Sequence, residues 1–232
     1  MSHGDNADNA DNADNGVLQG ETAADSRQTV VQKGPTADTD LSNFPVISVS
    51  GVLYRAHSTA HGPWYFDSGD GGRFNLEAPE GTCYAASDIW SATRERLADF
   101  FAIAGQSLAE AKADKFHVTE LTLETAIKCA NLDSAFVVES NITRELSSME
   151  DYSVSRSWAT AFRNEQFEGM FYPSRFTAGP ATAVAMFGAA GEHSLGLIGA
   201  VTSGRDACAQ AHIAVVSIVG SNNVRFEETP RP

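Results

Sequence analysis

Basic residues are scarce in this sequence. Its 232 residues include 16 lysines and arginines against 30 aspartates and glutamates, which gives a formal net charge of -14. Such an acidic protein repels the phosphate backbone of a nucleic acid. We therefore expect no direct nucleic-acid binding, while a local basic pocket for a smaller anion stays compatible with the composition.

Cysteine is rare too, and long apolar runs are missing. Cys83, Cys129 and Cys208 are too scattered for a disulfide framework, and none belongs to the Cys-x-x-Cys pair of a structural zinc site. We expect buried or half-buried free thiols and no metal. No stretch reaches the roughly 18 apolar residues that cross a bilayer, and no secretory signal is visible. These absences favour a protein of the reducing cytoplasm that does not engage a membrane.

Several signatures of known sites are absent. The sequence has no Gly-x-Gly-x-x-Gly after an expected strand, no Gly-x-x-x-x-Gly-Lys-Ser/Thr loop and no His-Glu-x-x-His. Without a Gly-x-Ser-x-Gly motif, Ser174 is not the nucleophile of a hydrolase elbow. His57 and His61 have a spacing that suits a metal on a helix, but Gly62 and Pro63 favour a loop. We interpret both as ordinary loop histidines.

The first part of the chain has low complexity. Residues 4–15 repeat Asp, Asn and Ala with a period of three and offer no apolar face. Such a segment cannot bury enough surface to offset its ordering entropy. We expect residues 1–43 to form a disordered acidic tail and residues 44–232 to form one folded domain, a length that supports a single core.

The body mixes strands and helices without the regular alternation of a doubly wound sheet. Alternating or apolar runs predict strands at 45–56, 81–86, 116–123, 169–176, 181–188 and 212–220. Amphipathic spacing predicts helices at 88–105, capped by Ser87 or Asp88 and stopped by Gly105, and at 151–166. Residues 123–132 are ambiguous between a turn and a short helix. This order predicts the α+β class, with a mixed sheet core and flanking helices.

A small set of polar and aromatic side chains lies at the ends and edges of these elements. The set consists of Tyr54 and Arg55 at the end of the first strand, Arg73 after a glycine-rich turn, Tyr84 in a short strand, Glu95 in a helix, and Ser174 after Pro173. Each of them alone is a weak signal. An arginine at a strand end is commonly a surface charge, a helical glutamate is usually solvated, and Ser174 alone would be a simple turn residue. Their order along the chain carries more information than any one of them.

Taken together, these residues resemble the RES domain family, named for its arginine, glutamate and serine. The resemblance runs from about Val52 to Gly188. It rests on four separated blocks in the family's order, which are LYR (53–55), GRFN (72–75), TCYAASDIWSATRE (82–95), and FEGMFYPSRF (167–176) leading into AVAMF (183–187). The acidic tail is not part of the pattern.

The resemblance implies a fold similar to ADP-ribosyltransferases and a toxin of the RES–Xre toxin–antitoxin type. Family members degrade NAD by cleaving the bond between nicotinamide and ribose, with water or phosphate as acceptor. NAD would then be the substrate, with no metal required. The implied partner is an antitoxin of the Xre type. An immunity protein would replace it if the chain is an effector delivered to a target cell.

The resemblance also assigns roles to the residues. Arg55 and Arg73 would bind the pyrophosphate of NAD, because guanidinium groups bind phosphate oxygens bidentately. Glu95 would stabilise the oxocarbenium-like ribose of the transition state, hydrogen-bond the ribose hydroxyls or orient the attacking acceptor, with Arg55 and Ser174 as its catalytic neighbours. Tyr84 would stack on nicotinamide, Tyr54 would form the same wall, and Ser174 would hold a ribose hydroxyl or the substrate amide.

Two other functions fit the same residues. A mono-ADP-ribosyltransferase would transfer ADP-ribose to a protein from the same pocket. In related families a glutamate two residues before the catalytic one often marks such transferases; here that position is Thr93, which favours cleavage of free NAD. The third hypothesis is an interaction domain with a decayed pocket. The joint presence of the arginines, Glu95 and Ser174 argues against it.

Overall fold

The computed structural model describes residues 31–98 and 107–217. In these residues, six strands form one mixed sheet in the order β1-β3-β7-β6-β5-β9. Their bounds are β1 Val46–Ser58, β3 Glu80–Ala86, β5 Phe116–Asn131, β6 Gly169–Pro173, β7 Thr182–Ala189 and β9 Gly196–Ser203. The β5–β6 pair is parallel and the other pairs are antiparallel. The predicted α+β class with a mixed sheet is confirmed.

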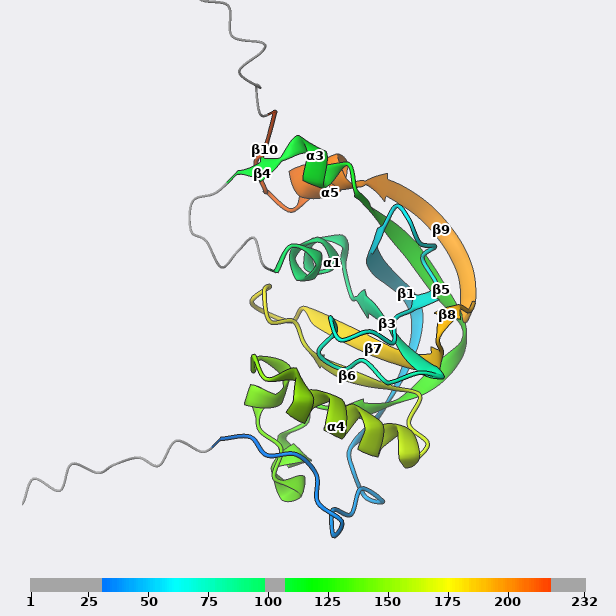
Figure 1. Ribbon diagram of the computed structural model, residues 1–232, viewed down its shortest axis with the longest axis vertical. Helices are drawn as coiled ribbons and strands as arrows, with labels where there is room; N and C mark the ends of the chain where they lie inside the picture. Colours follow the sequence, from blue (N-terminus) through cyan, green and yellow to red (C-terminus); the bar gives the residue numbers. More distant parts are fainter. Residues whose placement is uncertain (1–30, 99–106, 218–232) are drawn as a thin grey trace, which may run out of the picture. The chain divides into compact units, whose positions relative to one another are not determined.

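The sheet curves back on itself through one long strand. β5 pairs with β1 along nearly its whole length, while its first half also pairs with β9 and its last residues pair with β6. Because β1 reaches β3 at the other side, the strands β1, β3, β7, β6 and β5 make a closed circuit, and β9 lies outside it against β5 (Figure 1). The end of β1 therefore lies beside both β3 and β5, where it carries Tyr54 and Arg55.

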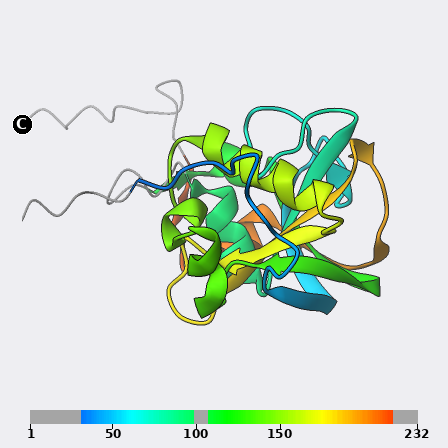
Figure 2. The same cartoon turned by 90° about the horizontal axis from the view of Figure 1, so that it is seen from below.

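Short pairs and helices surround the sheet. β2 (Tyr65–Phe66) pairs with β8 (Gly191–Glu192), and β4 (Leu108–Ala109) pairs with β10 (Val215–Val216). The helices are α1 (Ile89–Arg96), α3 (Glu110–Ala113), α4 (Tyr152–Asn164) and α5 (Gly204–Gln210), with 3-10 turns η1 (Ala135–Ser140) and η2 (Arg144–Ser147). Figure 2 shows the α4 side from below, whereas α1, α3 and α5 lie together at the other end in Figure 1.

Most predicted elements of the sheet are present. Strands occur where the sequence predicts them at 45–56, 81–86, 169–176 and 181–188, and the helix at 151–166 is α4. The helix predicted at 88–105 begins as expected, since the Asp88 side chain accepts a hydrogen bond from the Ser91 N–H at 2.8 Å. Its predicted end at Gly105 lies outside the described residues. The buried free thiols are also as expected.

The predictions for residues 123–132 and for the described part of 212–220 are wrong. Residues 123–132 are neither turn nor helix: through Asn131 they continue β5, because the start of β1 supplies a pairing partner that local preference cannot reveal, with Val46 opposite Ala130. The strand predicted at 212–220 is reduced to β10 in its described part. Its apolar Ile213 is buried with α5 instead of belonging to a central strand.

The segment before β1 contacts the body. Residues 1–30 of the expected tail lie outside the described residues, and residues 31–43 lie within them. Gln32 is 3% exposed, and its side-chain oxygen accepts hydrogen bonds from the Thr143 N–H at 2.8 Å and hydroxyl at 3.0 Å. The Trp158 indole donates to the Lys33 carbonyl at 2.8 Å, and Leu41 is buried. These contacts fasten the segment to α4 and the turns beside it.

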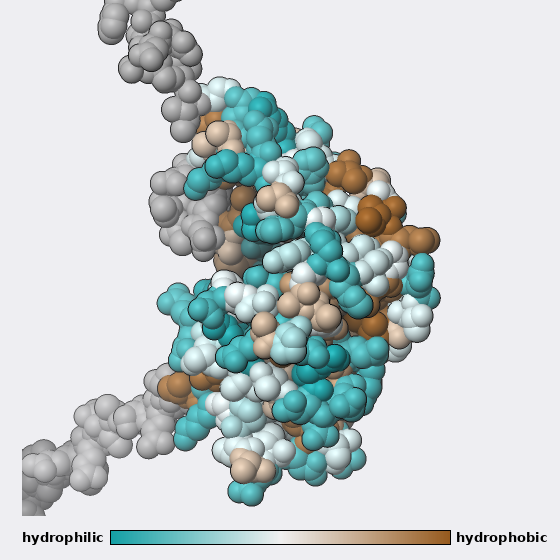
Figure 3. All heavy atoms as spheres, turned by 45° about the vertical axis from the view of Figure 1, so that its right-hand side comes forward, coloured by the Kyte–Doolittle hydropathy of each residue, from teal (hydrophilic) through white to brown (hydrophobic). Residues whose placement is uncertain are grey.

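Apolar packing fixes the two sides of the sheet. One buried cluster joins α4, through Trp158 and Phe162, to the strands β6 and β7. A second fills the interior of the closed circuit, and a third lies beneath α1 and α5. Apolar side chains are also exposed on β9, where Leu197, Ile198 and Val201 are 57–61% exposed. Figure 3 shows hydrophobic atoms gathered on this side of the molecule.

Candidate functional site

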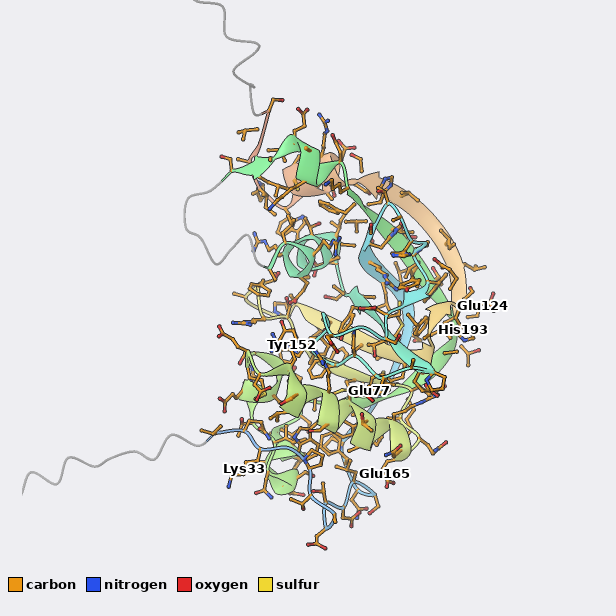
Figure 4. The ribbon with its side chains drawn as sticks, in the orientation of Figure 1. Lys33, Glu77, Glu124, Tyr152, Glu165 and His193 are labelled. Carbon is orange, nitrogen blue, oxygen red and sulfur yellow. The ribbon has the colours of Figure 1, made fainter. Side chains whose placement is uncertain are left out.

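A cavity of about 570 Å³ opens among β1, β3, α1 and the start of α4. Five of the predicted site residues line its wall: Tyr54, Arg55, Arg73, Tyr84 and Glu95. Ser174 is the one predicted residue that does not line it. They come from four separate parts of the chain, the end of β1, the loop before β3, β3 itself and α1. Figure 4 places Tyr152, another wall residue, at the start of α4 facing the strands.

Glu95 and Ser174 meet although 79 residues separate them. The Ser174 hydroxyl donates to Glu95 Oε1 at 2.7 Å, and the backbone N–H of Arg175 donates to the same oxygen at 3.0 Å. Helix α1 supplies the carboxylate from its last turn, and the turn after β6 supplies both donors. The carboxylate is thereby held in one orientation at the cavity wall.

Arg55 is a buried cation without a carboxylate partner. Arg55 lies near the C-terminal end of β1 and is 8% exposed. Its guanidinium donates to the Cys83 sulfur on β3. Burial raises the pKa of Cys83 to about 11, so this sulfur is a neutral thiol at pH 7 and does not offset the positive charge. Among the described residues no carboxylate forms an ion pair with Arg55. The cation is therefore available to an anion in the cavity.

Arg73 provides a second positive charge on another wall. Its guanidinium carbon lies 4.8 Å from the centre of the Tyr152 ring, and it donates to the Met149 carbonyl. Burial lowers the pKa of Arg73, and the neighbouring Arg175 lowers it further. An arginine still keeps its charge at neutral pH in such surroundings. The charges of Glu95 and Arg175 both act on Arg73, so the three charged groups share one region of the site.

The Tyr84 hydroxyl holds the loop that carries Arg73. It accepts from the Phe74 N–H at 2.8 Å and donates to Asn75 Oδ1 at 2.8 Å. Burial raises the pKa of Tyr84, so the phenol stays protonated and able to donate. A Cβ on Gly72 would approach Asn75 Oδ1 to 2.0 Å, which explains the glycine before Arg73. Tyr84 therefore braces the loop from beneath in addition to lining the cavity.

We expect Tyr84→Phe to weaken both the fold and the site. Loss of the hydroxyl leaves the Phe74 N–H without its acceptor in a buried position, which costs about 1–3 kcal/mol. The loosened loop then holds the Arg73 guanidinium less firmly at the cavity wall, and ligand affinity falls. Chemical denaturation measures the first effect, and ligand affinity measures the second. A variant as stable as the parent would show that water or another group replaces the phenol.

The cavity wall also contains residues that the sequence analysis did not assign to the site. Tyr172, two residues before Ser174, is 6% exposed, and burial raises its pKa, with Glu95 adding to the shift. Its place within FYPSR was the available signal. Tyr152 lies outside every motif. His57 belongs to the end of β1 instead of a loop; its Nε2 is 2.9 Å from the Thr119 hydroxyl, and burial lowers its pKa.

Neither a metal cluster nor a membrane helix is found in the described parts of the chain. Within residues 31–98 and 107–217, no group of three or more His, Cys, Asp or Glu side chains is arranged to hold a metal ion. His57 and His61 both line the cavity, but the nearest partner of the His57 Nδ1 is the His61 carbonyl at 2.9 Å. Over the same residues, every helix is too short or too polar to cross a membrane.

Comparison with known proteins gives one family and one fold. The family model of the RES domain matches residues 52–198, more than half of the chain. The crystal structure of the M. tuberculosis MbcT–MbcA toxin–antitoxin complex contains a chain of similar fold, with a TM-score of 0.57 and 13% sequence identity, covering 72% of this chain and 92% of that chain. At this identity the likeness concerns the fold alone. Among curated protein sequences, none matches this chain.

Proposed function

The chain belongs to the RES domain family, and from this premise we propose that it is an NAD-degrading toxin that cleaves the bond between nicotinamide and ribose, with water or phosphate as acceptor. One observation carries the proposal. The 2.7 Å hydrogen bond between Ser174 and Glu95 joins two of the family's three named residues at the wall of a cavity that also contains the third, Arg55.

The charges of the cavity suit a dinucleotide. NAD is an anion through its pyrophosphate, and Arg55 and Arg73 approach the cavity from different walls. Arginine binds phosphate oxygens with paired N–H groups. Such local cations explain how a protein with a net charge of -14 can hold an anionic substrate.

The chemistry needs few groups beyond a fixed carboxylate. Cleavage passes through an oxocarbenium-like ribose, whose positive charge Glu95 would stabilise. Nicotinamide leaves as a neutral molecule from a cationic pyridinium, so no strong general acid is required. Ser174 would act by orienting Glu95 and by sharing its hydroxyl with the substrate. The phenols of Tyr84 and Tyr172 stay protonated, since burial raises the pKa of each.

A protein partner is part of the proposal. The chain of similar fold comes from a toxin–antitoxin complex, and the RES resemblance implies an antitoxin of the Xre type. An immunity protein is the counterpart if the chain acts as a delivered effector. In both settings the substrate is the NAD of a cytoplasm, and the protein partner would prevent its loss in the producing cell.

Purified protein incubated with NAD, with and without inorganic phosphate, tests the proposal. We expect NAD to disappear and free nicotinamide to form. ADP-ribose as the second product establishes hydrolysis, and ADP-ribose-1″-phosphate formed only with phosphate establishes phosphorolysis. A folded protein, free of bound inhibitor, that consumes no NAD would contradict the proposal.

The second candidate, transfer of ADP-ribose to a protein, has less support. Thr93 holds the position where related transferases often carry a second glutamate. It is 0% exposed, and its hydroxyl donates to the Ile89 carbonyl of its own helix at 2.7 Å. A side chain so placed does not reach an incoming acceptor. If NAD is labelled in its ADP-ribose part, label that becomes covalently attached to a protein would support transfer instead.

A further inference from the structure

Two stacked aromatic rings form part of the cavity wall. The rings of His61 and Tyr65 lie 4.2 Å apart at an interplanar angle of 17°. Both residues line the cavity, with His61 exposed and Tyr65 half-buried. The backbone holds them in place. Tyr65 begins β2 opposite Glu192 of β8, and the Glu192 carboxylate accepts a hydrogen bond at 2.7 Å from the N–H of Gly62, which follows His61 in the chain. The pair is a built feature of the wall.

Three other aromatic rings of the cavity wall have contacts of their own. Tyr152 has the Arg73 guanidinium over its face, and the Tyr84 hydroxyl is tied to the loop before β3. Tyr172 is buried, with its ring 5.0 Å from that of Phe74. The pair of His61 and Tyr65, in which His61 is exposed, therefore offers a flat aromatic surface to a ring that enters from solution.

The pair belongs to a different group of contacts from Glu95. His57 lies two residues after Arg55 on β1 and is affected by its charge. The His57 Nδ1 is 2.9 Å from the carbonyl of His61, which carries one of the stacked rings. Glu95 is held by Ser174 and Arg175 and lies near Arg73. A dinucleotide with its reacting ribose at Glu95 and its pyrophosphate near Arg55 would extend its other nucleoside toward the rings.

We propose that His61 and Tyr65 form the platform on which the adenine base of NAD stacks. The inference rests on the proposed function, since it names the part of the substrate that this wall receives. Purines stack on aromatic side chains through their flat faces, and the favourable energy does not depend on hydrogen bonds. The platform then makes the site selective for adenine dinucleotides over the smaller nicotinamide mononucleotide.

The test compares two substrates that share the scissile bond. NAD carries adenosine and nicotinamide mononucleotide does not. We expect Tyr65→Leu and His61→Ala to lower kcat/KM for NAD about fivefold to a hundredfold through KM, with a much smaller change for the mononucleotide. Tyr65→Phe keeps the ring and should restore the NAD value. His193→Ala removes an exposed histidine outside the cavity wall and serves as the matched control.

Failure of the inference can be told from failure of the proposed function. Equal losses with both substrates would overturn the platform while leaving NAD cleavage intact. If the parent protein cleaves neither substrate, calorimetry with AMP still decides the inference. AMP binding that weakens in Tyr65→Leu and recovers in Tyr65→Phe supports a base platform. AMP binding that is absent, or unchanged by these variants, overturns it.

Discussion

The Glu95→Gln variant is expected to lose about a hundredfold to a thousandfold of its NAD turnover while it still binds NAD. Removing one preformed electrostatic contact to a charged transition state typically has this effect on kcat. Glutamine has the same shape, and its amide oxygen can accept the bonds that Glu95 Oε1 accepts from Ser174 and Arg175. The substitution therefore removes the negative charge and leaves the local structure in place. Single-turnover kinetics separates the chemical step from binding.

Glu168→Gln is the matched control for this substitution. Its carboxylate also accepts a backbone N–H, that of Lys128 at 2.7 Å, but it is exposed and does not line the cavity. We expect normal turnover from this variant. Ser174→Ala should fall between the two, because Glu95 keeps its charge and loses one of its donors. Unchanged turnover in Glu95→Gln would remove Glu95 from the mechanism.

The residues of the site differ in how far the sequence could predict them. Glu95 and Ser174 lie 79 residues apart, so no local pattern connects them, and only the ordered family blocks suggested that they act together. Arg55 was found through the LYR block at the predicted end of the first strand, although β1 continues to Ser58. Tyr152 and the pair of His61 and Tyr65 lie in segments without a motif, and the chain path alone brings them to the cavity.

Local sequence patterns also predicted only part of the fold. Strands with a clear apolar pattern, such as β3 and β7, were predictable because both faces of each are largely buried. The second half of β5 was not, since its strand conformation depends on β1, a distant partner in sequence. The run at 212–220 was misleading for the opposite reason. Its described apolar residues pack beside α5 or pair only briefly with β4, so hydrophobicity there does not indicate a central strand.

The Arg55→Met variant should lose ligand affinity and keep or gain stability. Hydrogen bonds to a charged group contribute about 1.5–3 kcal/mol, which corresponds to roughly a tenfold to hundredfold rise in Kd. Arg55 is 8% exposed and its contact is the neutral Cys83 thiol, so the free protein bears the desolvation cost of a cation without a carboxylate partner. Methionine fills similar space without that cost. We expect Tm of the ligand-free variant to rise by about 2–4 °C for each kcal/mol recovered.

Arg163→Met is the matched control, because Arg163, unlike Arg55, has a carboxylate partner among the described residues. Arg163 forms an ion pair with Glu80 at 3.0 Å, outside the cavity wall. We expect this variant to be slightly less stable and fully active. Thermal melts with ADP-ribose, which is not consumed, measure affinity and stability together. A ligand that binds only the native state raises Tm by an amount that grows with the ratio of ligand concentration to Kd. ADP-ribose should raise Tm of the parent and of Arg163→Met, and much less that of Arg55→Met. A lower Tm in Arg55→Met with an unchanged ligand effect would make Arg55 a structural residue, and the pyrophosphate would then depend on Arg73.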